Sequence, residues 1–471
     1  MIWGGCHIHR VLHVLANGPP DVNGYAVRTH ALLHAQLESE KITVIGLTSP
    51  WYPERESLIE DYNFDGVNYI RTIHPAHLSG RLSIPMRWVS GRGMKKIAKI
   101  NSKSEINQNT SLLNRIVGTM KYVTRRFLLP FTTLIRPFFS WIEERILFKH
   151  FTNRIIEVAT NSDADVIHAH VPYRVGIPAR KAARKLGIPF VYEMRGMWEE
   201  SAVASGRWRA GGIAHRRFRR LETKVMKDAD ALICISETLR KEAISRGINS
   251  EKISVVPNAV ELKKSEYEES DIYDEVKKKI GNSAVVGYIG SLRELEGVDR
   301  TAEAASILIN RGIDVKLFVL SSEPGQSELL THCKKLGIAE HTIITGPVPH
   351  NQVAPFYDLI DVFVVSRPNK RVTRLVTPLK PFEAMQAGCA IVMSDLPALA
   401  EIVNDGQTGR LYPPDDIEAL ADTIEQLLLD EDERTSLGIA ASEWILEHRT
   451  WSKVVNETPE IYHRLIQDSG R

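Results

Sequence analysis

The chain has 471 residues, of which 43% are hydrophobic and 25% charged, an ordinary globular composition that excludes disordered and fibrous proteins. Sixty Lys and Arg against 58 Asp and Glu leave a formal charge of +2, which excludes a uniformly basic nucleic-acid-binding chain. Any basic site must therefore be local. Because a single core stops growing near about 250–300 residues, the length predicts about two domains.

The four cysteines lie far apart without a Cys-x-x-Cys pair, a pattern that favours a reducing cytosol and indicates neither a disulfide framework nor a zinc site. We read no export signal at the N-terminus. The most apolar window, 127–139, contains two prolines and Arg136 and is shorter than the roughly 20 residues of a spanning helix. We expect a cytoplasmic protein without a transmembrane helix.

Short apolar runs alternate with amphipathic stretches, the pattern of parallel sheets covered by helices on both faces. In the first half, predicted strands cover Arg10–Leu15, Ile42–Gly46, Val166–His170, Pro189–Glu193 and Ala231–Ile235, with helices at Ala26–Glu38, Gly176–Leu186 and Glu237–Ser245. In the second half, predicted strands cover Ala284–Gly290, Val315–Leu320, Thr342–Thr345, Val362–Val365 and Ala390–Ser394. The pattern predicts an α/β fold of two doubly wound, Rossmann-like domains.

The boundary between the domains is expected after the apolar stretch 255–260, because the charged segment 263–279 is weakly patterned and resembles a linker. We therefore predict an N-terminal domain over 1–262 and a C-terminal domain over 263–440. A last helix over 441–466 is expected to carry the segment 441–471 back to the first domain.

Residues 81–154 form a strongly basic insert, with fifteen Lys or Arg against three Glu, a local balance of +12. Within it, residues 112–151 interleave aromatic and aliphatic side chains with arginine at roughly helical spacing, which is typical of a basic amphipathic helix. Such a helix would attach the protein to an anionic membrane surface. The alternative is that its aromatic side chains cover the core of the first domain or a dimer partner.

Ligands of open α/β sheets bind beyond the carboxyl ends of the strands. After the first strand, Gly24 begins a helix, where it would let a phosphate approach backbone N–H groups or simply form a tight turn. His168 and His170 end a later strand on one face, as site residues or as buried structural histidines. The run 192–200, which includes Glu193, Arg195 and Glu200, comes at the end of the next strand and would contact an acceptor or form a surface salt-bridge cluster.

The second domain carries a denser set of candidates after its strands, namely Gly290, Ser291, Arg293, Arg367, Thr377, Leu379, Lys380 and Glu383. A nucleoside diphosphate needs cations and N–H donors for its oxygens and a carboxylate for its ribose hydroxyls. Arg293, Arg367 and Lys380 are the candidate cations, and surface bases are the alternative for each. Glu383 is the candidate carboxylate.

In their order along nearly the whole chain, these motifs resemble the GT-B retaining glycosyltransferases of the glycosyltransferase family 4 type. The resemblance rests on the Gly24 loop, His170, Ser236-Glu237, Val256-Pro-Asn-Ala-Val-Glu261, Gly290, Glu383-Ala-Met-Gln-Ala-Gly388, Glu401 to Gly409 and Thr450-Trp451. The strings His168-Ala-His170, Tyr192-Glu-Met-Arg195 and Thr377-Pro-Leu-Lys380-Pro-Phe-Glu383 are similar to the branch associated with bacterial exopolysaccharide gene clusters.

The resemblance implies a hexose transferred with retention from a UDP- or GDP-linked sugar, generally without a bound metal and with no other cofactor. The donor would lie on the second domain, and a lipid-linked or oligosaccharide acceptor of surface polysaccharide biosynthesis would lie on the first. Glu383 matches the glutamate that binds the ribose, and His170 a histidine near the donor sugar. Gly24 matches the loop near the diphosphate, and Asn258 the interdomain strand end.

Three positions depart from the family pattern. Ser291 and Glu296 stand where relatives usually carry Arg and Lys, and Leu375 stands where many carry the first of two paired glutamates. We therefore expect Arg293, Arg367 and Lys380 to stabilise the leaving diphosphate, with His170, Lys380 and Arg367 as the catalytic set. A catalytically silent subunit that binds a partner transferase, or a GT-B-type sugar-nucleotide epimerase, remains as an alternative.

Overall fold

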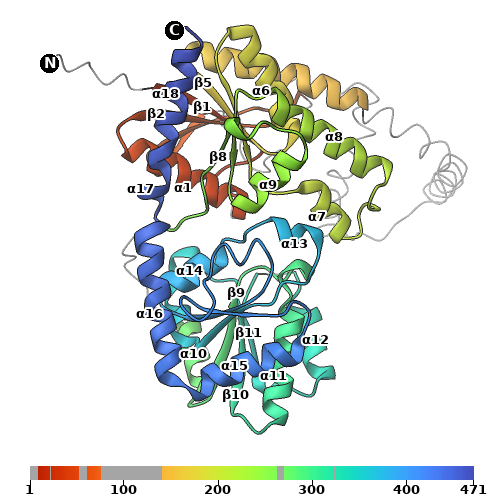
Figure 1. Ribbon diagram of the computed structural model, residues 1–471, viewed down its shortest axis with the longest axis vertical. Helices are drawn as coiled ribbons and strands as arrows, with labels where there is room; N and C mark the ends of the chain where they lie inside the picture. Colours follow the sequence, from red (N-terminus) through yellow and green to blue (C-terminus); the bar gives the residue numbers. More distant parts are fainter. Residues whose placement is uncertain are drawn as a thin grey trace, which may run out of the picture.

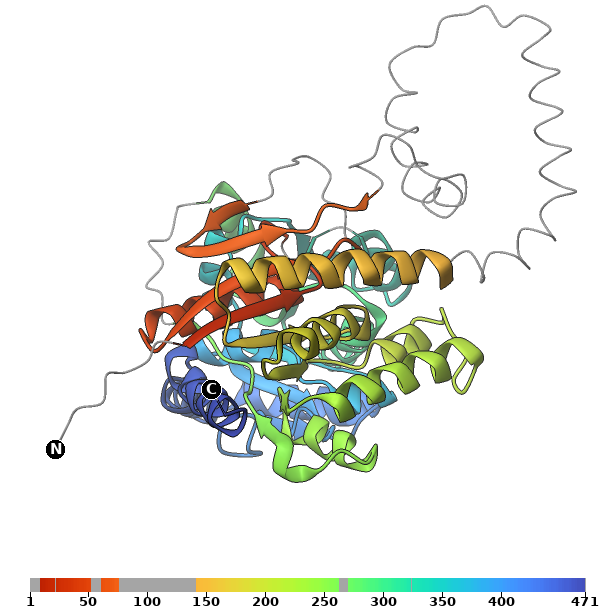
Figure 2. The ribbon, with the colours of Figure 1, turned by 90° about the horizontal axis from the view of Figure 1, so that it is seen from above.

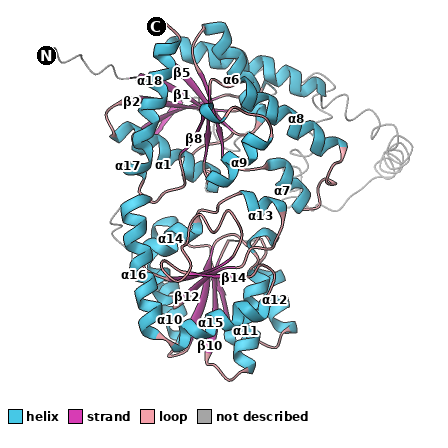
Figure 3. Cartoon of the chain, viewed as in Figure 1, coloured by secondary structure: helices cyan, strands magenta, loops and turns pink. Residues whose placement is uncertain are grey.

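The computed structural model describes residues 9–21, 23–51, 61–75, 141–261, 270–322 and 324–470. Two α/β domains follow one another along the long axis (Figure 1), and each has its strands in the middle and helices around them (Figure 3). The first sheet has the order β3-β4-β2-β1-β5-β6-β7-β8, and the second β11-β10-β9-β12-β13-β14. Every pairing is parallel except that of β3 with β4. The predicted fold of two doubly wound domains is confirmed.

All five strands predicted for the first domain form. The first sheet consists of β1 (His9–Leu15), β2 (Ile42–Thr48), β3 (Asp61–Phe64), β4 (Val67–Arg71), β5 (Val166–His170), β6 (Phe190–Met194), β7 (Ala231–Cys234) and β8 (Ile253–Val255). Its helices are α1 (Gly24–Glu38), a helix over 141–161, α6 (Tyr173–Leu186), α7 (Trp198–Ala204), α8 (Ile213–Asp228) and α9 (Glu237–Ser245). The hairpin β3–β4 was not predicted. It turns at Asp65-Gly66, whose φ angles of +48° and +80° are typical of a tight hairpin turn.

The second sheet likewise contains every predicted strand. It consists of β9 (Ala284–Ile289), β10 (Val315–Leu320), β11 (Thr342–Thr345), β12 (Val362–Val365), β13 (Ala390–Ser394) and the short, unpredicted β14 (Arg410–Tyr412). Its helices include α10 (Asp271–Ile280), α11 (Val298–Asn310), α12 (Gln326–Lys335), α13 (Arg371–Leu375), α14 (Lys380–Gln386) and α15 (Ile417–Leu429). Helix α10 occupies much of the expected linker, because Val276 and Ile280 bury themselves in the core of the second domain.

The C-terminal segment differs from the single helix expected over 441–466. It forms α16 (Glu431–His448), α17 (Trp451–Val454) and α18 (Thr458–Asp468), which run along both domains (Figure 1). Ala441 of α16 lies in the core of the second domain, whereas Trp451 and Tyr462 lie in the core of the first. The chain therefore crosses between the domains around 449–450, where Thr450 forms a β-bridge with Val260.

Of the predicted basic insert 81–154, residues 81–140 lie outside the described residues. Its end belongs to the helix over 141–161, whose Leu147, Phe151 and Ile155 are buried, the latter two in the core of the first domain. For this part of the segment, Phe151 covers the core as the alternative predicts, whereas Trp141 remains exposed. Within the described ranges, no helix is both long and apolar enough to cross a bilayer.

Candidate active site

The carboxyl ends of both sheets meet at the contact between the domains. The chain order reverses between β1 and β5 in the first sheet and between β9 and β12 in the second, and ligands of open α/β sheets bind at such switch points. The Asn258 side-chain amide donates to Thr377 Oγ1 at 3.3 Å. A Cβ atom at Gly24 would lie 3.5 Å from Leu379. The candidate loops of the two domains therefore lie side by side.

Glu193, at the carboxyl end of β6, holds two arginines inside the first domain. Arg195 Nε donates to Glu193 Oε1 at 2.9 Å, and Arg28 Nη1 lies 2.8 Å from the same oxygen. Burial alone would raise the pKa of Glu193, but Arg195 and Arg28 outweigh it and hold the pKa well below its usual range. The ionised carboxylate has no exposed surface, so Glu193 supports Arg195 and does not itself offer a contact to an acceptor.

Arg195 in turn fixes the first turn of α1, the helix that begins at Gly24. Its Nη1 donates to Thr29 Oγ1 at 2.5 Å, and its guanidinium lies 5.1 Å from the centre of the Tyr25 ring. The Asn23 side chain caps the same turn by accepting from the backbone N–H groups of Tyr25 and Ala26, each at 3.0 Å. The loop expected near the diphosphate is thus held by its own cap and by the strand-end arginine.

Three histidines from neighbouring strands lie behind this arginine. His13 Nδ1 is 2.9 Å from His170 Nε2, Arg195 contacts His170 Nδ1, and the Tyr462 hydroxyl lies 2.8 Å from His168 Nδ1. All three rings are fully buried, and burial is the main cause that lowers the pKa of each. They are therefore neutral at pH 7. His170 lies at the predicted strand end but is covered, so it acts here on Arg195 and not on an open surface.

The same histidines, His13, His168 and His170, are the one group in the described part of the chain with metal-ligand spacing, with candidate ligand atoms within 4.8 Å of one another. The Arg195 guanidinium occupies one side of His170, and the single carboxylate nearby, Glu193, is already paired with two arginines. A metal cation bound here would lie next to two positively charged guanidinium groups, and the one nearby carboxylate is already neutralised by them. The surroundings therefore disfavour a cation. The arrangement fits a buried polar network.

In the second domain, Glu383 and Lys380 lie one turn apart at the start of α14. Lys380 Nζ lies 2.8 Å and 3.1 Å from the two carboxylate oxygens, and the Tyr357 hydroxyl donates to Glu383 Oε2 at 2.9 Å. The side chains of Lys380 and Glu383 are 33% and 30% exposed. They can therefore meet a ligand, while the buried Tyr357 fixes the carboxylate. Tyr357 was not predicted, because nothing in the sequence connects it with Glu383.

Glu296 is the second residue that sequence reasoning missed, since it was noted only as a departure from the family. Its carboxylate lies between two predicted cations, 2.7 Å from Arg367 Nη2 and 2.5 Å from Arg293 Nη2. Burial would raise the pKa of Glu296, but Arg367 and Arg293 lower it below its usual value. Arg367 also donates to the Val376 carbonyl at 3.1 Å. Glu296 therefore anchors Arg293 and Arg367, the two arginines expected to stand in for the missing family cations.

The remaining candidates surround the end of β9. Gly290 has a φ of +156°, and a Cβ atom there would come within 2.7 Å of the Tyr288 hydroxyl, so a side chain would not fit. The pKa of Tyr288 is raised well above its usual value, mainly by burial and then by the nearby charge of Glu296. The Tyr288 hydroxyl also donates to the Ser291 carbonyl at 3.3 Å. Ser291 itself is exposed.

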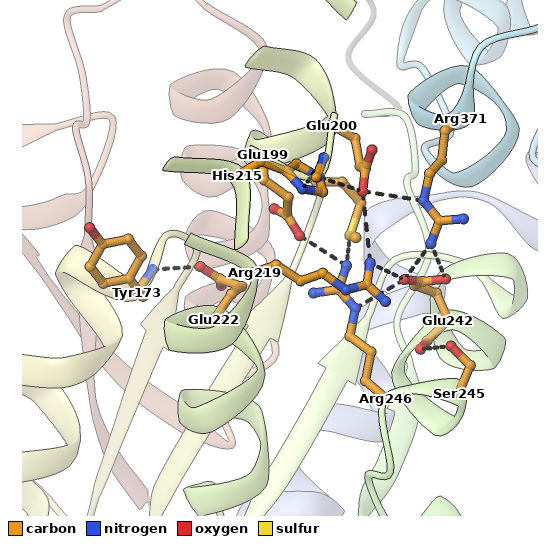
Figure 4. A network of polar contacts seen from close by, with 12 residues as sticks. Tyr173, Glu199, Glu200, His215, Arg219, Glu222, Glu242, Ser245, Arg246 and Arg371 are labelled. Carbon is orange, nitrogen blue, oxygen red and sulfur yellow. Dashed lines mark hydrogen bonds and ion pairs between the residues drawn. The ribbon is translucent and has the colours of Figure 1, made fainter. Parts of the chain in front are cut away.

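A network of ion pairs between buried carboxylates and partly exposed arginines joins the two domains beside this site (Figure 4). Arg371, the first residue of α13, reaches into the first domain, where its Nε donates to Glu200 at 3.2 Å and its Nη2 to Glu242 at 2.9 Å. The two carboxylates are buried and are also shared with Arg219. For Glu200, the structure thus shows a salt-bridge cluster, one of the two expectations for the run 192–200, but its carboxylates are buried and do not lie at the surface.

Comparison with known proteins agrees with this architecture. Residues 269–444 match the model of the family described as glycosyl transferases group 1, and residues 122–264 match that of Glycosyltransferase Family 4. The two matches fall on the two domains in the order in which the chain forms them. Together with the fold, they define the chain as a GT-B protein.

Within that class, the sequence is similar to glycosyltransferases, with a Glycosyltransferase Family 4 model matching part of the first domain and a group 1 model matching the second. It is 24% identical to an alpha-monoglucosyldiacylglycerol synthase of Streptococcus pneumoniae over 59% of this chain and 62% of that one. It is 23% identical to an alpha-maltose-1-phosphate synthase of Mycolicibacterium smegmatis over 66% and 82%. A capsular polysaccharide biosynthesis glycosyltransferase of Staphylococcus aureus is 22% identical over 53% and 65%. The chain thus spans less than two thirds of the first and third of these relatives.

Solved structures share the fold over almost the whole chain. A sucrose-phosphate synthase from Thermosynechococcus elongatus has a TM-score of 0.67 at 15% identity, with 98% of this chain and 100% of that one covered. Anabaena HepE, solved with UDP and glucose, has a TM-score of 0.61 at 13% identity and covers 96% and 98%. At these identities the likeness concerns the fold alone.

Proposed function

We propose that this protein transfers a hexose from a nucleotide-sugar donor to a lipid-linked or oligosaccharide acceptor in surface polysaccharide biosynthesis. The observation that carries the proposal is the meeting of the Gly24 turn with the Thr377 to Glu383 loop at the switch points of both sheets. This juxtaposition offers a carboxylate for a ribose, cations for a diphosphate and a helix N-terminus in one place.

In this proposal Glu383 accepts hydrogen bonds from the ribose, and Lys380 and Arg367 stabilise the charge that develops on the leaving diphosphate. Arg195, held by Glu193 and His170, fixes the α1 turn that faces the diphosphate. Arg293, two-thirds exposed, is a further diphosphate contact, and Gly290 and Ser291 leave room for the donor. The family resemblance is the basis for three further parts of the proposal. They are a UDP- or GDP-linked donor, retention of the anomeric configuration and transfer without a metal. HepE, one structural neighbour, was solved with UDP-glucose.

The test is incubation of the purified chain with a panel of UDP- and GDP-linked hexoses, with and without lipid-linked and oligosaccharide acceptors. We expect acceptor-dependent release of the nucleoside diphosphate together with a glycosylated product that keeps the donor anomeric configuration. Nucleotide release without any acceptor would favour the epimerase alternative. Absence of turnover with every donor, despite donor binding, would overturn the proposal.

A catalytically silent subunit is the second candidate, and one observation favours it. The three candidate cations, Arg293, Arg367 and Lys380, are each already paired with a carboxylate. Leu375, at the position of the absent first glutamate, packs on the core of the first domain. Such a subunit would bind a partner transferase and raise the partner's activity without any turnover of its own.

We also propose a cytoplasmic location at the inner face of the membrane, where lipid-linked acceptors lie. The sequence basis is the basic segment 81–154.

A further inference from the structure

Helices α6 and α8 concentrate positive charge on one side of the first domain. They carry eleven Lys or Arg against Glu222 and Asp228 alone, a balance of +9 within a chain whose total is +2. The two helices pack against each other. These two adjoining helices are therefore far more basic than the chain as a whole.

The outward face of α8 is basic along its whole length. Its buried residues, Phe218, Glu222, Val225 and Met226, turn inward, and at a period of 3.6 residues the opposite face carries Ile213, Arg216, Arg217, Arg220, Lys224 and Lys227. Arg217 pairs with Glu144. Arg216, Arg220 and Lys224 are exposed, and none of them forms an ion pair with an acid of the described residues.

Large apolar side chains are exposed at the same end of the domain. Ile213, the first residue of α8, is 82% exposed, and Trp141 and Ile146 of the helix over 141–161 are 43% and 42% exposed. The ion pair of Arg217 with Glu144 links the beginnings of these two helices. Both helices extend to the same side of the first domain (Figures 1 and 2).

We propose that this surface, formed by Ile213, Arg216, Arg220 and Lys224 of α8 together with Trp141, binds the anionic face of a lipid bilayer. The unpaired cations would contact the phosphates of the headgroups. The exposed aliphatic and indole side chains next to them would insert into the outer part of the acyl chains. A nucleic acid or an acidic polysaccharide would use the cations but would gain nothing from an isoleucine exposed at a helix end. The proposal deepens the membrane location proposed above but does not depend on glycosyl transfer.

The experiment is sedimentation of the full chain with vesicles of phosphatidylcholine, alone or mixed with phosphatidylglycerol, at low and high salt. The test variant is Arg216→Gln/Arg220→Gln/Lys224→Gln. The matched control is Lys278→Gln/Lys334→Gln/Lys335→Gln, which removes three exposed lysines of the second domain. We expect an about hundredfold loss of partition onto anionic vesicles for the test variant, since each basic residue contributes about 1 kcal/mol. The control should bind as the unmodified chain does.

A second variant, Ile213→Ser, separates the apolar contribution from the charge. It should weaken binding by roughly tenfold at both salt concentrations, because the buried apolar surface is not screened by salt. The proposal is overturned if the test variant and its control bind vesicles equally, if binding ignores lipid charge, or if only an acidic polysaccharide or a nucleic acid is bound. Nucleotide binding in solution should stay unchanged in all variants, so a failure here is distinct from a failure of the proposed function.

Discussion

Glu383 is the residue whose role is most sharply defined. Its carboxylate is held by Tyr357 and Lys380 and remains partly exposed, so it is preorganised to accept ribose hydroxyls. We expect Glu383→Ala to weaken binding of a nucleoside diphosphate by about 2 kcal/mol, the usual contribution of hydrogen bonds to a charged group. Isothermal titration calorimetry measures the loss. Unchanged affinity in a folded variant would contradict the ribose assignment.

Arg367 and Lys380 are expected to affect turnover more than donor binding, because the charge on the diphosphate grows as the glycosidic bond breaks. Alanine at either position should reduce kcat by about 10²–10³ with a smaller change in KM. Lys370→Ala is the matched control, because Lys370 lies on the same loop but pairs with Glu294 at the surface. Equal and small effects of all three substitutions would identify Arg367 and Lys380 as structural bases.

Glu222 gives the first domain a pH-dependent stability. Burial is the main cause that raises its pKa from 4.5 to about 7, and it accepts hydrogen bonds from the Tyr173 N–H and the Tyr192 hydroxyl. The folded state therefore holds this proton more tightly than the unfolded state, so stability falls as the pH rises from about 4.5 to about 7 and stays reduced above. Glu222→Gln should remove this loss.

Thermal unfolding of this variant should show a gain of at most about 3 kcal/mol over the unmodified chain at about pH 8 and little difference at about pH 4. The same gain at both pH values would show that the titration of Glu222 is not the cause. A loss at both would mean that the amide fails to replace the bond with Tyr192.

At the scale of elements, helix α13 couples the donor loop to the first domain. It begins at Arg371, four residues after Arg367, and its last residue is followed by the Thr377 to Glu383 loop. The Arg371 side chain is 51% exposed, so each of its ion pairs with Glu200 and Glu242 contributes at most about 1 kcal/mol. The pairs nevertheless fix α13 against α7 and α9, which lie opposite.

We expect Arg371→Ala to raise the donor KM severalfold with little change in kcat, and to increase the radius of gyration measured by small-angle X-ray scattering. High salt should reproduce both effects in the unmodified chain. Arg374→Ala is the matched control, because Arg374 lies on the same helix and its one hydrogen bond to a described residue is with Asn369, in its own domain. If the control behaves like Arg371→Ala, the ion pairs with the first domain are not responsible.

The central strands could be predicted because each is a run of buried β-branched and aliphatic residues between turns. The edge strand β3 could not, since its sequence Asp61–Phe64 is polar and largely exposed. Helix α10 was missed because only Val276 and Ile280 of its ten residues are buried. The break of the last helix at Thr450 depends on a bridge to Val260, a contact almost two hundred residues away in sequence.

The candidate site also contains some contacts that the sequence could predict and others that it could not. Lys380 and Glu383 could be paired from the sequence because they lie three residues apart at the start of a helix. The anchoring of Arg367 by Glu296, of Glu383 by Tyr357 and of the first domain by Arg371 depends on contacts between residues 26 to 171 positions apart. Such contacts follow from how the domains pack and leave no local pattern.

On the scale of the whole molecule, we expect one nucleotide to bind between the two sheets. The first domain would supply the α1 turn held by Arg195, and the second the carboxylate and cations of the Thr377 to Glu383 loop and of Arg367. The C-terminal segment crosses back to the first domain at Thr450 and packs in its core. The two domains are therefore connected twice, once by the segment that precedes α10 and once by this crossing.

A crystal structure of the chain with bound uridine or guanosine diphosphate tests this arrangement most directly. We expect the ribose hydroxyls to lie within hydrogen-bond distance of the Glu383 carboxylate and the diphosphate to lie between Lys380, Arg367 and the Gly24 turn. A nucleotide bound away from the contact between the two sheets, or with its ribose turned away from Glu383, would contradict it.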